Sequence, residues 1–161
     1  MTKSLLIIAF LFFAATVSAQ EIKKIKITDL EKTIKESKTP LIVNFWATFC
    51  IPCIEEIPYF QETVKKYKKE NVTLLLVSID MREDYPKVKS FAAKKQFTAP
   101  IVWLNETDAD YFCPKVDSSW SGAIPATLFI NNKTGYRKFY EEQVNKDKLE
   151  KEIMAILGKK G

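Results

Sequence analysis

The sequence predicts an α/β domain in which helices flank a central mixed β-sheet. Three observations support this fold class. Apolar runs rich in β-favouring residues alternate with segments whose apolar residues recur every three or four positions. Such alternation early in the chain indicates parallel strands joined by right-handed helical crossovers. Near the end of the chain, two further β-like runs are separated by Asn-Lys-Thr-Gly, which indicates an antiparallel hairpin.

The first part of the domain contains two predicted strands and two predicted helices. Residues 21–27 alternate apolar and polar side chains, which is typical of a short strand. Residues 28–38 begin with a Thr-Asp start signal and place two aliphatic residues four apart, so a helix is expected. The apolar run at 40–46 is typical of a strand buried on both faces. Residues 52–69 form an amphipathic helical pattern with lysines on its outer face.

The middle of the chain continues the alternation. Residues 72–80 are a second run of β-favouring apolar residues, and we expect another central strand there. Residues 84–96 carry a proline near the first turn and are predicted to be helical. Residues 99–104 form a third, shorter strand. Residues 108–121 show no clear period, so we interpret them as an irregular insertion that shapes partner choice or is simply a loop.

The last part of the chain is predicted to be a hairpin followed by a helix. The strands are expected at 124–131 and 136–141, with Gly135 able to adopt a positive φ in the turn between them. We expect these antiparallel strands at the edge of the sheet. Residues 145–157 have a helical pattern that Gly158 ends.

Residues 1–19 are expected to be a secretory signal peptide. Lys3 precedes an uncharged apolar run at 5–17, and Val-Ser-Ala then places small or apolar residues before a predicted cleavage site at Gln20. The run is too short to span a bilayer comfortably. The alternatives are an uncleaved signal anchor and a buried N-terminal helix. We therefore assign residues 20–161 to one domain in the periplasm or another extracytoplasmic compartment, where disulfides persist.

Composition and charge exclude several function classes. Apolar residues make up 47% and charged residues 28%, which is typical of a folded globule. The 25 Lys and Arg exceed the 20 Asp and Glu only modestly and are scattered, so nucleic-acid binding is not expected. There is no histidine, which excludes Ser-His and Cys-His nucleophiles and imidazole zinc sites. Three cysteines are too few for an all-thiolate zinc site, and we expect neither a metal nor a cofactor.

The pair Cys50 and Cys53 lies where a buried strand ends and a helix begins. A pair with this spacing can serve redox exchange, a structural crosslink, half of a metal site, or packing. A helix N-terminus stabilises a thiolate, and the pKa of cysteines there falls from about 8.5 to roughly 3.5–7.5. Cys50 then attacks a disulfide, and Cys53 resolves the mixed disulfide. A passive crosslink is less favoured because so short a loop constrains little of the unfolded chain.

Residues 44–53, Asn-Phe-Trp-Ala-Thr-Phe-Cys-Ile-Pro-Cys, resemble the active-site segment of thioredoxins. With Glu56-Ile-Pro after it, this segment is more similar to the exported TlpA/ResA-like thiol-disulfide oxidoreductases. Their glutamate, three residues after the second cysteine, is followed by x-Pro. The later Ile124-Pro125 is similar to the cis-proline segment of that group. The resemblance covers nearly the whole mature chain and implies a thioredoxin-like fold.

The resemblance also implies roles for individual residues. The catalytic residues are Cys50, Cys53 and Glu56, and the substrate-binding residues are Trp46, Pro52, Ile124 and Pro125. Glu56 is expected to exchange protons with the thiols, unless it is a solvated glutamate on the helix surface. Pro125 is expected to be cis, unless it is a trans proline that opens an edge strand. Asn44 stands where cytoplasmic thioredoxins resemble one another in having a buried aspartate, and Trp46 is most simply core packing beside the site.

The function implied is that of an exported thiol-disulfide reductase. It would reduce disulfide-bearing envelope proteins with electrons from a membrane thiol donor, and we expect a monomer. Ile51-Pro52 does not fix the direction of the reaction. Alternatives are a peroxiredoxin-like peroxidase, which Ala47 disfavours because those enzymes have Thr or Ser three residues before the reactive cysteine, and a non-enzymatic interaction module. Cys113 is either a buried apolar residue or a secondary thiol, for example in an intermolecular disulfide.

Overall fold

The computed structural model describes residues 21–159, so the predicted signal segment lies outside the described residues. Six strands form one sheet in the order β1-β4-β3-β2-β5-β6. The strands are β1 (Lys23–Ile25), β2 (Leu41–Trp46), β3 (Thr73–Ser78), β4 (Ile101–Leu104), β5 (Ala126–Asn131) and β6 (Tyr136–Tyr140). The helices are α1 (Ile27–Glu36), α2 (Ile51–Lys66), α3 (Tyr85–Lys94), α4 (Ala109–Val116) and α5 (Lys146–Ile156), with a 3-10 turn, η1 (Lys68–Glu70), after α2.

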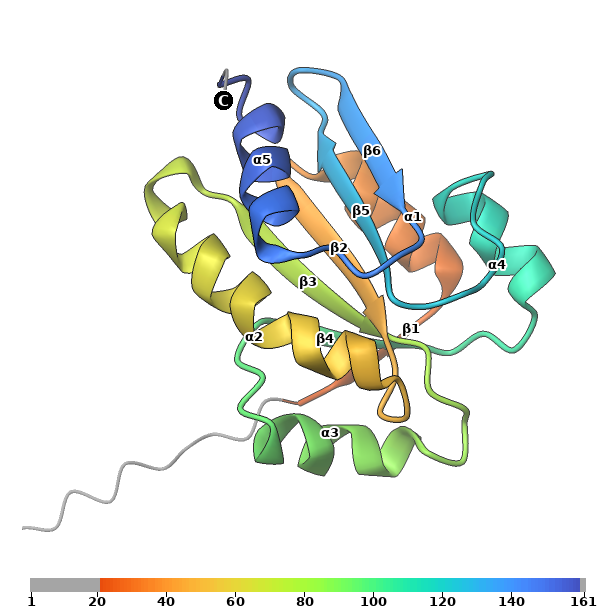
Figure 1. Cartoon of the computed structure of the whole chain (residues 1–161). Helices are drawn as coiled ribbons and strands as arrows, with labels where there is room; N and C mark the ends of the chain where they lie inside the picture. Colours follow the sequence, from red (N-terminus) through yellow and green to blue (C-terminus); the bar gives the residue numbers. More distant parts are fainter. Residues whose placement is uncertain (1–20, 160–161) are drawn as a thin grey trace, which may run out of the picture.

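Helices cover both faces of the sheet (Figure 1). One hydrophobic cluster contains the buried residues of α2, α3 and α5 together with one side of the sheet. The other contains those of α1 and α4 and the opposite side. All six residues of β2 are buried, as expected for a strand that has helices on both faces. The predicted α/β fold with a mixed sheet is therefore confirmed.

The topology is parallel on one side of the sheet and antiparallel on the other. Strands β1, β4, β3 and β2 are parallel, whereas β5 runs antiparallel to both β2 and β6. The hairpin is therefore present as predicted. Of its two strands, however, only β6 lies at an edge of the sheet. Strand β5 is interior and fully buried, because its mostly apolar sequence pairs with residues 41–45 of β2 on one side and with β6 on the other.

The register brings three chain segments to one end of the sheet. Strands β2 and β3 end there, and β5 begins there, since Phe45 pairs with both Val77 and Ala126. The segments that follow Trp46 and Ser78, and the segment that precedes β5, must then meet at this end. Helix α2 begins at the same place, and its axis bends along its length (Figure 1). Pro58 inside the helix removes one backbone hydrogen bond and accounts for a bend.

The expectation of an irregular insertion at 108–121 is wrong for half of its length, because α4 occupies residues 109–116. Asp108 caps this helix by accepting a hydrogen bond from the backbone N–H of Tyr111 at 3.2 Å. Phe112, Cys113 and Val116 form its buried face. The helix was missed because it is short and has a proline, Pro114, in its interior.

The hairpin turn and the chain end agree with the prediction. Gly135 has a φ of 72° in the turn between β5 and β6, and Gly158 has a φ of 69° just after α5. Asn145 caps α5 by accepting a hydrogen bond from the backbone N–H of Lys148 at 2.9 Å. Within residues 21–159, none of the helices combines the length and the apolar character needed to cross a membrane.

Candidate active site

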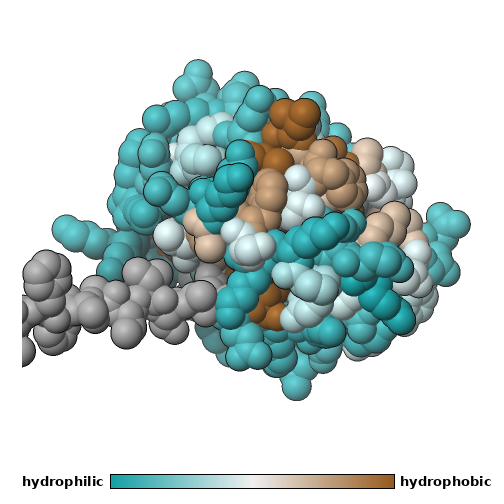
Figure 2. All heavy atoms as spheres, turned by 90° about the horizontal axis from the view of Figure 1, so that it is seen from below, coloured by the Kyte–Doolittle hydropathy of each residue, from teal (hydrophilic) through white to brown (hydrophobic). Residues whose placement is uncertain are grey.

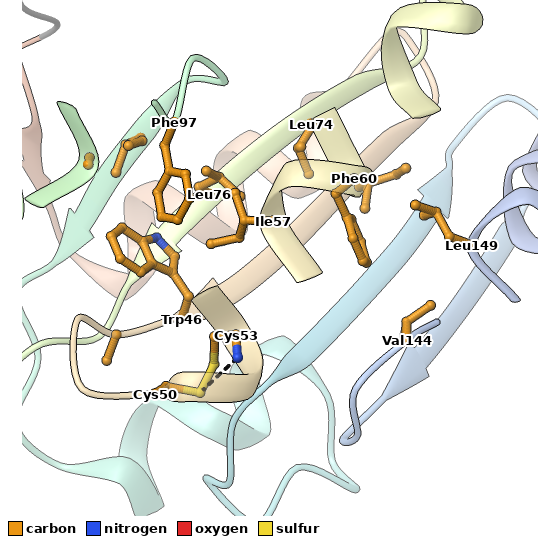
Figure 3. Packing of buried hydrophobic residues seen from close by; sticks show 14 of the residues in the cluster. Trp46, Cys50, Cys53, Ile57, Phe60, Leu74, Leu76, Phe97, Val144 and Leu149 are labelled. Atoms are coloured by element: carbon orange, nitrogen blue, oxygen red, sulfur yellow. Dashed lines mark hydrogen bonds between the residues drawn. A yellow bond between two sulfur atoms is a disulfide. The ribbon is translucent and has the colours of Figure 1, made fainter. Parts of the chain in front are cut away.

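Cys50 and Cys53 form a disulfide at the start of α2, with their Cα atoms 5.3 Å apart. Cys50 is the N-cap residue of the helix, and its sulfur accepts a hydrogen bond from the backbone N–H of Cys53 at 3.3 Å. Figure 3 shows this contact beside Trp46. Cys50 is 7% exposed and Cys53 is completely buried, so Cys50 is the more accessible of the two residues.

The start of α2 provides a favourable electrostatic environment for a thiolate at Cys50. The free backbone N–H groups and the positive end of the helix dipole lie there, and the first turn contains no acidic residue. Pro52 has no N–H, but at this position in a helix the backbone donor would be unpaired in any case. In the reduced protein, these backbone groups would stabilise a negative sulfur at Cys50 more than water does.

The segment before Cys50 is fixed by a buried carboxylate that sequence reasoning missed. Asp80, 2% exposed, follows β3 and accepts hydrogen bonds from the backbone N–H and the hydroxyl of Thr48, at 2.9 and 2.5 Å. Its other oxygen accepts from Ser78 Oγ at 2.8 Å. The backbone N–H of Cys50 donates to the carbonyl of Ala47 at 3.0 Å. The cysteine loop is thus tied to the end of the neighbouring strand.

Asp80→Ala is expected to lower the free energy of unfolding by about 2–4 kcal/mol, because three donors lose a buried, charged acceptor. Urea denaturation measures this loss. The matched control is Asp84→Ala, which removes a surface carboxylate whose solvent-exposed ion pair with Lys87 should contribute little to stability. Equal stability of the two variants would contradict the anchoring role of Asp80.

Glu56 is fully buried, which excludes the alternative of a solvated glutamate on the helix surface. It lies three residues after Cys53 and therefore on the same side of α2. One oxygen accepts a hydrogen bond from Asn44 Nδ2 at 2.7 Å, and the other accepts from the backbone N–H of Val144 at 3.0 Å. Burial raises the pKa of Glu56 to about 7, although both hydrogen bonds act to lower it. Both the protonated and the charged form of this carboxyl group are therefore accessible near neutral pH.

Asn44 links Glu56 to β5. Its side-chain N–H group also donates to Thr127 Oγ1 at 3.0 Å, while its Oδ1 has no hydrogen-bond partner within the described part of the chain. A carboxamide can serve either form of Glu56, because its N–H donates to the carboxylate and its oxygen accepts from the acid. The neutral Asn44 thus hydrogen-bonds to Glu56 without adding a second buried charge.

The peptide bond between Ile124 and Pro125 is cis, in agreement with the resemblance. Pro125 is buried and Ile124 is partly exposed. The pairing of Ala126 with Phe45 places this segment next to the end of β2, from which the cysteine loop also leaves. Gln143 donates a hydrogen bond to the carbonyl of Pro52 at 3.2 Å and adds a third chain segment beside the disulfide.

The aromatic and aliphatic residues around the disulfide divide into buried and exposed ones. Trp46 is fully buried and packs edge-on against Phe97, with ring centroids 5.3 Å apart, so it offers no surface to a docked chain. Phe49 and Ile51, which flank Cys50, are 63% and 69% exposed. Hydrophobic residues gather on the face where β2 and β3 end, as Figure 2 shows. Exposed apolar residues beside a reactive group are typical of a docking surface.

The comparisons with known proteins agree with this geometry. The model of the AhpC/TSA family matches residues 11–135, which is more than half of the chain. The protein belongs to the AhpC/TSA family. A thiol-disulfide oxidoreductase ResA from Bacillus cereus is 31% identical over 137 residues, covering 83% of this chain and 69% of that protein. A ResA from Geobacillus kaustophilus is 29% identical over 116 residues, and this match spans 72% of the chain but only 62% of the relative's length.

Solved structures of other proteins have the same fold as this AhpC/TSA-family protein. A thioredoxin-related protein from Neisseria meningitidis serogroup B superposes with a TM-score of 0.66 at 25% identity, over 78% of this chain and 91% of that one. A putative thiol:disulfide interchange protein DsbE from Chlorobium tepidum superposes with a TM-score of 0.60 at 20% identity, over 80% and 85% of the two chains. The thioredoxin-like fold that the sequence motifs implied is confirmed.

The third cysteine of this AhpC/TSA-family protein lies apart from the disulfide, on the opposite face of the sheet. Cys113 is a free thiol on α4 and is 2% exposed. Burial, and then the nearby Glu141 and Asp110 carboxylates, raise its pKa to about 11, so it stays a neutral thiol. Within residues 21–159, no three Cys, Asp or Glu side chains are grouped so that they could hold a metal ion.

Proposed function

We propose that the protein is an exported thiol-disulfide oxidoreductase that acts as a protein-disulfide reductase. The observation that carries the proposal is the Cys50–Cys53 disulfide at the start of α2, next to the buried Glu56. The names of its ResA relatives support the chemistry. Export rests on the predicted signal segment at residues 1–19, and the proposed substrates are disulfide-bearing envelope proteins.

The catalytic cycle follows from the two sulfurs. In the reduced protein, the Cys50 thiolate attacks one sulfur of a substrate disulfide, so that a mixed disulfide forms and the first substrate thiolate leaves. The Cys53 thiolate then attacks Cys50 Sγ, which breaks the mixed disulfide and releases the second substrate thiolate. Two protons end on the substrate thiols, and the Cys50–Cys53 disulfide remains. A dithiol on a membrane carrier is the proposed donor that reduces it again.

Glu56 is proposed to accept the proton of Cys53 as that thiol becomes the attacking nucleophile. A pKa of about 7 suits a group that must take up and return a proton near neutral pH. Because Cys53 is buried, water reaches it poorly, and a proton acceptor on the same side of α2 serves in its place.

The direction of the reaction is tested by the reduction potential of the Cys50–Cys53 couple. Equilibration with glutathione buffers, followed by quantification of the two thiols, gives this value. For a reductase we expect a potential near that of thioredoxin, ~−270 mV. A potential near that of the strong oxidant DsbA, about −120 mV, would instead assign the protein to disulfide formation.

A further inference from the structure

The segment before the cis proline is held by an unusual concentration of hydrogen bonds. Ser121, Gly122 and Ala123 lead directly into Ile124-Pro125, which is proposed to meet the substrate. We propose that Glu141 is a positioning residue that fixes this segment so that Ile124 presents its backbone to a protein substrate. The inference rests on the proposed function and adds to it the residue that pre-organises substrate docking.

The carboxylate of Glu141 gathers three donors from the segment. Its Oε1 accepts hydrogen bonds from the backbone N–H of Ser121 at 3.0 Å, from Ser121 Oγ at 2.5 Å and from the backbone N–H of Ala123 at 2.8 Å. Its Oε2 accepts from the N–H of Ser121 at 3.2 Å. Hydrogen bonds to a charged acceptor are about twice as strong as neutral ones. Burial acts to raise the pKa of Glu141, but these hydrogen bonds outweigh it and lower the pKa, so the carboxylate is charged at neutral pH.

The position of Glu141 follows from the hairpin. The last pair between β5 and β6 joins Thr127 to Tyr140, so the backbone ladder ends there. Glu141 is the next residue of the chain. Its side chain accepts hydrogen bonds from the segment before β5, where the backbone ladder between the two strands has ended. The carboxylate reaches across 18 to 20 residues of sequence to bind Ala123 and Ser121.

The segment is also supported from the side of α4. Gly122 has a φ of +98°, and a Cβ added there would lie 3.7 Å from both Ala109 Cβ and Cys113 Sγ, so α4 packs directly against it. Trp120 is 4% exposed and donates its indole N–H to the carbonyl of Ala123 at 2.9 Å. The insertion that contains α4 therefore serves as a base for the substrate-facing segment.

These contacts use the backbone groups of Ala123 but not those of the next residue, Ile124. Both backbone groups of Ala123 are used, its N–H by Glu141 and its carbonyl by Trp120. Within residues 21–159, no hydrogen bond occupies the N–H or the carbonyl of Ile124, which is partly exposed. A fixed residue with free backbone groups can pair with an extended peptide without first being ordered, and such pre-organisation lowers the cost of binding.

The test compares Glu141→Ala, Glu141→Gln and the control Glu142→Ala, whose carboxylate pairs with Lys148 instead. Insulin serves as the protein disulfide and 5,5′-dithiobis(2-nitrobenzoate) as a small disulfide that needs no docking segment. We expect Glu141→Ala to raise the KM for insulin about ten-fold while its rate with the small disulfide changes less than about two-fold. Glu141→Gln retains an acceptor oxygen and should recover most of the affinity. Equal losses on both substrates, or no loss on insulin, would overturn the inference.

Hydrogen exchange gives a readout that does not depend on activity. In Glu141→Ala, the Ser121 and Ala123 amides should exchange at least about ten-fold faster, while Glu142→Ala leaves them unchanged. Unchanged exchange would refute the positioning role even if the wild-type protein reduces insulin. Wild-type protein that fails to reduce either disulfide refutes the proposed function itself, and the two failures are therefore distinguishable.

Discussion

Cys50→Ser is expected to reduce the dithiothreitol-dependent reduction of insulin to the uncatalysed rate, a loss on the order of 10³-fold or more. The serine hydroxyl stays protonated at neutral pH, so the nucleophile is lost while the fold is retained. Turbidity of the released insulin B chain measures the rate. Cys53→Ser should instead accumulate the mixed disulfide at Cys50, which mass spectrometry of the trapped complex detects.

Cys113→Ser is the matched control for both variants, because it removes a thiol that lies on the opposite face of the sheet and takes no part in the exchange. We expect it to retain catalysed insulin reduction, unlike Cys50→Ser. Equal rates for the wild type and Cys50→Ser would end the catalytic assignment. Alkylation of the reduced protein adds a second check. The pKa of Cys50 obtained in this way should lie below the value of about 8.5 for free cysteine, because the start of α2 stabilises the thiolate.

Glu56→Gln is expected to remove most of the pH dependence of stability between about pH 5 and pH 8. The pKa of Glu56 is about 7 in the folded protein against the ordinary value of 4.5. The folded state thus binds the proton more tightly than the unfolded state does. Stability from this group is complete below about pH 4.5 and is lost as the pH rises through about 7. The wild type should lose about 2–3 kcal/mol across this range.

Urea denaturation at several pH values measures the effect, and Glu55→Gln is the matched control. Glu55 is the neighbouring residue but is exposed, so its variant should keep the wild-type slope. Glu56→Gln also loses one hydrogen bond, to Asn44 or to Val144, which lowers its whole curve by about 1 kcal/mol. A wild-type curve that is flat over this range would show that Glu56 stays charged in the folded protein.

The strands and most helices could be predicted because their signals are local. The apolar run that became β2 and the amphipathic pattern that became α2 each occupy consecutive residues, and their observed bounds differ from the expected ones by three residues or fewer. Helix α4 was missed because Pro114 contradicts a helical interpretation, while the packing of Phe112 and Val116 against the sheet compensates for it. The interior position of β5 depends on its pairing with β2, which no local pattern reports.

The candidate site likewise contains residues that local spacing predicts and residues that it does not. The two cysteines and Glu56 share one helix, so spacing alone places them together. The carboxylates of Asp80 and Glu141 were not predicted, because each acts on a segment far away in the sequence. Asp80 did leave a signal, since a carboxylate two residues after a buried parallel strand lies at the edge where such strands end. For Glu141 we find no comparable signal, because its partners lie beyond the end of a hairpin.

The pairing of Phe45 with Ala126 fixes the relative position of two segments beside the disulfide. The cysteine loop begins two residues after Phe45, and Pro125 lies one residue before Ala126, so the two segments leave the sheet from adjacent strands beside the same residue pair. Their relative position is therefore set by the hydrogen bonds between two neighbouring interior strands, β2 and β5. For the proposed reductase, we therefore expect disulfides in unfolded chains to be reduced more readily than those packed inside folded domains, because only an extended segment can pair with the backbone of Ile124.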